Sequence, residues 1–279
     1  MTDTDVRWLP LEGQHGTLQR VVVSVAILVA ISNTLVQWVL TAGIGAGIRP
    51  IGLVIVAAAV VVGKPARWGS AAGLLVTGAL LSGWTYGVIW AISAFATAAV
   101  AGRLWVRDGR DRDRGAVNWY LRYCGAALGG VVVLAMTSAW LLDVLGQAAF
   151  SLTVGPTLAA TLPLAIVGGP LVRLAVTRTD WNRWDVRGAA PSTTARLIAV
   201  LVAACWAVFG YLGSFLFRIT DQMAPTILAR QFPASVLSFI RLWGDQGTYA
   251  QALLGVVSLA LLWILLRRGG SRRGLLARL

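Results

Sequence analysis

The chain has 279 residues, of which 57% are hydrophobic and only 13% are charged, and its formal net charge is +13. This composition excludes an ordinary soluble domain and indicates an integral membrane protein that is solvated by the lipid bilayer. We attribute the basic excess to arginines that set the topology and not to nucleic-acid binding. The only histidine, His15, lies in the N-terminal tail, and Cys124 and Cys205 lie in apolar runs. The sequence therefore predicts no metal site and no disulfide framework.

Eight apolar runs follow the N-terminal tail at residues 1–19, and each predicts one membrane-spanning helix. Their approximate limits are 21–42, 48–63, 68–83, 87–105, 119–142, 152–177, 197–217 and 248–266. The expected fold is an all-α integral membrane protein with eight transmembrane helices. It consists of a six-helix bundle over 20–178, a cytoplasmic loop over 179–196, a two-helix extension over 197–267 and a basic tail over 268–279. Within the extension, Pro233 predicts the start of an outer helix that lies flat in the membrane interface.

The first of these runs carries a stripe of small and polar residues. Ala26, Ala30, Asn33 and Gln37 recur at steps of three or four, so they share one face of a helix. A glycine-rich break over 43–50 follows, and it carries Arg49 just before Pro50. A polar-striped span next to a charged break predicts a site near one membrane surface.

The basic residues predict the orientation of the chain. If the N-terminus is cytoplasmic, all but four of the 24 Lys and Arg residues fall inside or at the inner interface. The four exceptions are Arg49, Arg218, Arg230 and Arg241. This bias follows the positive-inside rule and predicts a multi-pass protein of the cell membrane with both termini in the cytoplasm.

Few residues are available for chemistry. The sequence contains no phosphate-binding Gly-x-x-x-x-Gly-Lys loop, and one histidine in the tail cannot serve a Ser-His pair within the membrane. Glu12 is the only glutamate, and no ionisable group is expected at mid-membrane, where ion-coupled carriers place one. We therefore expect neither an enzyme nor an ion-coupled carrier, and we expect no cofactor.

The predicted topology brings polar and aromatic residues together on the outer side. These candidate ligand-binding residues are Asn33, Gln37, Arg49, Trp84, Tyr86, Trp90 and Asp143. Aromatic rings with a few hydrogen-bonding groups and one charge of each sign are typical of a small-molecule pocket. The alternative is an ordinary interfacial belt of aromatic residues, with Arg49 paired to Asp143 or to a lipid phosphate.

Three short motifs follow one another in the six-helix unit: Ala26-x-x-x-Ala30, Gly45-Ala-Gly-Ile-Arg-Pro50, and Gly63-Lys-Pro-Ala-Arg-Trp-Gly69 continuing to Gly73. In the order of these motifs, the unit resembles the substrate-binding S component of energy-coupling factor transporters. The resemblance implies that Ala26 and Ala30 contact a membrane coupling subunit, that separate subunits hydrolyse ATP, and that the ligand resembles a vitamin. The chain departs from this family in its two additional spans and in lacking an acidic residue at 79–83. The same region also resembles, as a second choice, the membrane part of MASE1-type sensors.

Two functions follow as expectations. The first is a small-molecule-binding membrane subunit of a transporter, without an ATPase of its own. The second is a non-transporting membrane scaffold or sensor module that acts through a partner protein.

Overall fold

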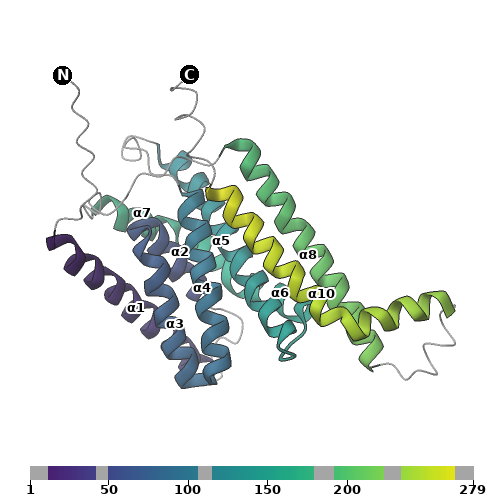
Figure 1. Ribbon diagram of the computed structural model, residues 1–279. Helices are drawn as coiled ribbons and strands as arrows, with labels where there is room; N and C mark the ends of the chain where they lie inside the picture. The colour runs from purple at the N-terminus through teal and green to yellow at the C-terminus, as the bar shows by residue number, and fades with distance from the viewer. Residues whose placement is uncertain (1–11, 42–49, 106–114, 179–191, 223–233, 268–279) are drawn as a thin grey trace.

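The computed structural model describes residues 12–41, 50–105, 115–178, 192–222 and 234–267 (Figure 1). These residues form helices joined by short turns, and the described part of the chain contains no β-strand. The helices are α1 (Glu12–Thr41), α2 (Ile51–Val62), α3 (Pro65–Ser82), α4 (Trp84–Leu104), α5 (Ala116–Val144), α6 (Phe150–Val167), α7 (Gly169–Arg178), α8 (Thr193–Gln222) and α10 (Ala234–Arg267). The prediction of an all-α fold is thereby confirmed.

Six of the described helices, α1, α4, α5, α6, α8 and α10, are long and apolar enough to cross a membrane. The remaining two predicted spans differ from this group. α2 has 12 residues, which reach about 18 Å, little more than half of the hydrocarbon thickness. α3 has 18 residues, but polar and small residues such as Arg67 and Ser70 dilute its apolar character. Eight complete spans therefore remain a prediction.

The sixth predicted span, 152–177, is interrupted in the structure, where α6 ends at Val167 and α7 begins at Gly169. Pro170 has no N–H to donate to the carbonyl of Ile166, and its ring crowds that carbonyl, which favours a kink or a break at this point. A side chain of α5 supplies the missing donor: the Tyr120 hydroxyl donates to the Ile166 oxygen at 3.1 Å. The neighbouring hydroxyl of Tyr123 donates to the Ala165 oxygen at 2.7 Å.

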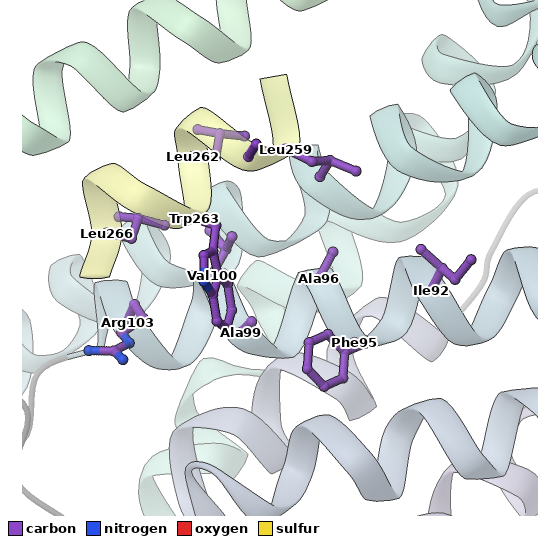
Figure 2. A pocket seen from close by; sticks show the side chains of 11 residues that line it. Ile92, Phe95, Ala96, Ala99, Val100, Arg103, Leu259, Leu262, Trp263 and Leu266 are labelled. Atoms are coloured by element: carbon purple, nitrogen blue, oxygen red, sulfur yellow. The ribbon is translucent and has the colours of Figure 1, made fainter. Parts of the chain in front are cut away.

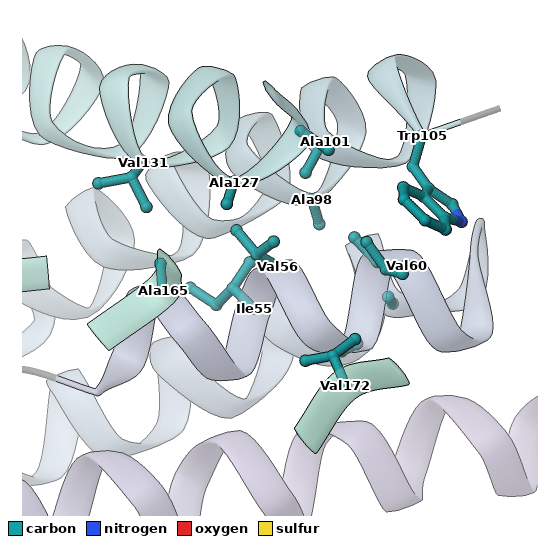
Figure 3. Close-up of a cluster of buried hydrophobic side chains, with 14 of the residues drawn as sticks. Ile55, Val56, Val60, Ala98, Ala101, Trp105, Ala127, Val131, Ala165 and Val172 are labelled. Atoms are coloured by element: carbon teal, nitrogen blue, oxygen red, sulfur yellow. The ribbon is translucent and has the colours of Figure 1, made fainter. Parts of the chain in front are cut away.

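α2 lies at the centre of the bundle, and eight of its 12 residues are buried. Figure 3 shows Ile55, Val56 and Val60 of α2 among side chains from α4, α5, α6 and α7. The other residues labelled there are Ala98, Ala101, Trp105, Ala127, Val131, Ala165 and Val172, and they belong to the same buried cluster. The most apolar helix of the unit is therefore shielded from lipid by its neighbours.

A second buried cluster joins the C-terminal helices to the bundle. It contains Met136 and Trp140 of α5, Phe150 at the start of α6, Trp206 of α8 and Leu262 of α10. Trp140 and Trp206 meet edge to face with their ring centroids 6.2 Å apart. The pair α8 and α10 therefore packs on α5 through a core of its own.

α10 is one helix of 34 residues, whereas the sequence predicted an outer interfacial helix after Pro233 and a separate span over 248–266. A straight helix of this length would reach about 51 Å, well beyond the hydrocarbon core. In Figure 1, α10 bends, and its first part points away from the bundle while its last part packs beside α8. The interfacial position of the first part stays a prediction.

The basic side chains that the structure describes gather at one end of the bundle, which we call the basic end. α1 and α3 begin there, and α4 and α10 end there (Figure 1). These basic residues are Arg20, Lys64, Arg67, Arg103, Arg122, Arg173 and Arg196. That this end faces the cytoplasm, as the positive-inside rule predicts, stays a prediction.

Cysteine labelling tests this topology. With Cys124 and Cys205 replaced by alanine, a cysteine placed at Gly45 or Gly244 should react with an impermeant maleimide added outside the cell. A cysteine at Gly109 or Gly188 should react only after the membrane is permeabilised. Outside labelling at Gly109 would exclude the eight-span arrangement.

Candidate functional site

The polar stripe of α1 faces α3. The amide nitrogen of Asn33 donates to the Thr77 hydroxyl at 2.9 Å, and this hydroxyl in turn donates to the Gly73 carbonyl at 2.9 Å. Thr77 is buried. Asn33 therefore makes a polar contact between two helices, toward the end of the bundle opposite the basic end.

The small residues of α1 also lie close to α3. A Cβ atom built on Gly73 would come within 2.5 Å of the Ala26 carbonyl oxygen, and one on Gly69 within 2.6 Å of the Val25 Cβ. Ala26 and Ala30 are half-buried. Five bulky apolar residues of α1 are more than half exposed: Val23, Ile27, Leu28, Ile31 and Leu35. Contact of Ala26 and Ala30 with a coupling subunit stays a prediction.

The aromatic residues predicted to line an outer pocket have different surroundings. Trp84 is 75% exposed, as expected of an interfacial anchor, whereas Trp90 packs against the central core. The Tyr86 hydroxyl donates to the side-chain oxygen of Gln147 at 3.4 Å. This contact links the start of α4 to the segment after α5, at the end of the bundle opposite the basic end.

Asp143 faces the C-terminal helices. Its carboxylate accepts hydrogen bonds from the amide nitrogen of Gln251 at 3.2 Å and from the Ser214 hydroxyl at 3.4 Å. The same side-chain nitrogen of Gln251 also donates to the Gly210 carbonyl at 3.2 Å. The main-chain carbonyl of Gln251 accepts from the Trp140 indole N–H at 2.8 Å. This network joins α5, α8 and α10.

Sequence reasoning missed Gln251 and Ser214. The available signal was a buried polar residue inside each of the last two apolar runs, because such groups require partners in a membrane. Two other predicted residues cannot be placed. Arg49 lies outside the described residues, and Gln37 lies on α1 with its side chain outside them.

The start of α2 lies deep in the bundle. A Cβ built on Gly52 would come within 3.1 Å of the Thr161 Cβ and 3.4 Å of Val131. Thr161 lies about 16 Å along α6 from its first residue, which is about half of a bilayer's hydrocarbon thickness. Thr157 and Thr161 are buried there, and the Thr161 hydroxyl donates to the Thr157 carbonyl at 2.6 Å. α2 therefore begins about halfway along α6, with its N-terminus directed away from the basic end.

Two grooves lie on the surface of the described helices, and both are apolar. One, of about 310 Å³, lies between α4 and α10 and contains Arg103. The other, of about 400 Å³, lies between α1, α2 and α7. Neither is lined by the outer residues predicted from the sequence. No group of three or more potential metal ligands occurs among the residues that the structure describes.

Comparison with models of known protein families, with curated protein sequences and with solved structures gave no significant match.

Proposed function

We propose that this chain is a membrane subunit that captures a small metabolite at the end opposite the basic end and depends on separate subunits to hydrolyse ATP. The observation that carries this proposal is the short central helix α2, whose first turn packs through Gly52 against Thr161, about halfway along α6. Interrupted or short helices are the places where transporters bind their substrates, because the unsatisfied N–H groups of the first turn are available there.

The residues around this helix start support a polar, anionic ligand group. The N-terminus of a helix carries a partial positive charge, and Arg49 directly precedes Pro50 in the sequence. The Asn33–Thr77 and Tyr86–Gln147 contacts lie toward the same end of the bundle and offer hydrogen-bonding groups. The low count of reactive residues supports binding without catalysis.

Arg49→Ala tests the proposal. Ligands that co-purify with the unmodified protein would first be identified by mass spectrometry and then titrated against both forms. We expect the variant to insert and fold normally but to bind about tenfold or more weakly, since a charge-assisted hydrogen bond is lost. Arg20→Ala, at the basic end, is the matched control and should bind normally. Equal affinity of all three forms would contradict this site.

A second candidate function is a scaffold or sensor module. It is favoured by the pairing of Asn33 with Thr77 and of Asp143 with Gln251 and Ser214, which are structural contacts between helices. Co-purification distinguishes the two functions. ATPase or coupling subunits with a bound metabolite support capture, whereas a ligand-free protein with a cytoplasmic signalling partner supports the second function.

A further inference from the structure

The groove between α4 and α10 is an apolar channel with a positive charge at one end. Figure 2 shows it running from Ile92 along α4 to Arg103, with Leu259, Trp263 and Leu266 of α10 beside it. Ile92 and Arg103 are separated by about 16 Å of helix, which is about half of the hydrocarbon thickness and so one lipid leaflet. Ile92 and Trp263 are each 42% exposed, so the groove opens to the surroundings of the bundle.

A second arginine lies at the same end of the groove. The guanidinium carbon of Arg67 is 5.9 Å from the centre of the Trp263 ring. Its Nε atom is buried and has no hydrogen-bond partner among the described residues. Arg103 lies close enough to Arg67 for the two positive charges to repel each other. Asp143, the one acidic residue whose side chain the structure describes, lies at the other end of α5 from this site.

Two adjacent positive charges at the mouth of an apolar groove are complementary to a ligand that combines a negative charge with an apolar chain. An anionic headgroup would offset the repulsion between the arginines and supply acceptors for the buried Nε–H. A free inorganic anion would satisfy the charges but would leave the apolar groove unused. A fatty acyl chain of one leaflet matches the length and the apolar lining of the groove.

We propose that this groove binds one anionic phospholipid, with its phosphate between Arg67 and Arg103 and an acyl chain along α4 and α10. The lipid belongs to the leaflet at the basic end. By covering both α4 and α10, it would connect the C-terminal pair of helices to the rest of the bundle.

Lipid titration of the purified full-length protein tests this site. The probes are dioleoylphosphatidylglycerol and dioleoylphosphatidylcholine, and binding is measured by native mass spectrometry. We expect the anionic dioleoylphosphatidylglycerol to bind more tightly than dioleoylphosphatidylcholine. Arg67→Gln combined with Arg103→Gln should weaken its binding by about five- to thirtyfold, since each basic side chain contributes about a factor of five. Arg196→Gln, an exposed arginine at the same end, removes one charge outside the groove and should bind normally.

A second variant tests the groove independently of the charges. Ala260 lines the groove and is exposed, so Ala260→Phe fills it without displacing a buried neighbour. This variant should lose affinity for the dioleoyl lipid but keep its affinity for dihexanoylphosphatidylglycerol, whose chains are too short to need the groove. Lipid affinities are compared only between variants whose helix content equals that of the unmodified protein. If the double arginine variant does not fold, the two single variants and Ala260→Phe decide the result.

Several results would overturn the proposal. Equal binding of the two lipids would exclude recognition of charge. If Arg196→Gln lost as much affinity for phosphatidylglycerol as the double arginine variant, the lipid would be attracted to the basic end as a whole and not to a defined site. Complete displacement of the lipid by millimolar inorganic phosphate would show an anion site that does not use the groove.

Discussion

Gly255→Ala should destabilise the protein, although alanine normally stabilises a helix relative to glycine. A Cβ atom on Gly255 would overlap the indole of Trp140. The ring has little room to move, because its N–H is bonded to the Gln251 carbonyl at 2.8 Å and it packs edge to face on Trp206. We therefore expect a loss of about 1–3 kcal/mol in unfolding free energy, as is typical of overpacking, with α10 displaced from α5.

Thermal unfolding in detergent, followed by the helical circular dichroism signal, measures this effect. The matched control is Gly125→Ala, because a Cβ on Gly125 would have no neighbour within 4 Å. This control should be as stable as the unmodified protein or slightly more stable. Combining Gly255→Ala with Trp140→Leu should restore part of the loss. Equal stability of the two glycine variants would show that α10 does not dock on Trp140.

The second large effect is expected from Gly73→Ala on α3. The new Cβ would lie 2.5 Å from the Ala26 carbonyl oxygen, a backbone atom that no change of rotamer can remove. α1 and α3 would have to separate, which would also lengthen the Asn33–Thr77 hydrogen bond. A loss of about 1–3 kcal/mol is again expected, since close backbone approach through small residues is what holds such helix pairs together in lipid.

The same interface can be tested from α1. Ala26→Leu and Ala30→Leu should each lower the unfolding temperature, because both positions are half-buried. Ala72→Leu on α3 is the control, since that residue is exposed. If Ala26→Leu, Ala30→Leu and Gly73→Ala all fold and assemble as well as the control, the stripe faces lipid and the packing between α1 and α3 is wrong.

Much of the helical content could be predicted from the apolar runs. The predicted spans over 87–105 and 119–142 correspond to α4 and α5, and the run over 21–42 corresponds to the greater part of α1. These predictions succeed because a segment in lipid must satisfy its own backbone hydrogen bonds, which an isolated helix does. The spacing of Asn33 from Ala26 also correctly placed both residues on one side of α1, which packs on α3.

Other features depended on signals that hydrophobicity does not contain. The break between α6 and α7 follows from Pro170, whose effect a run of apolar residues conceals. The continuity of α10 through Gly244 and Gly247 could not be inferred, because glycines and a charged residue in this stretch resemble a loop. Asp143 was expected to face an outer pocket, yet its described partners are on α8 and α10.

The amino-acid sequence by itself determined the all-α class of the protein and most of its helical segments. Transfer into lipid depends on the local sum of side-chain hydrophobicities, and helix formation within lipid is also local. Only the tertiary structure decided which helices meet, because between helices in lipid the contact energy comes from close packing of specific surfaces. The contacts of Gly73 with Ala26, of Gly255 with Trp140 and of Arg67 with Trp263 join residues that are distant in the chain. No pattern within one segment specifies such a pairing, and both the proposed ligand site at the start of α2 and the proposed lipid-binding groove between α4 and α10 depend on it.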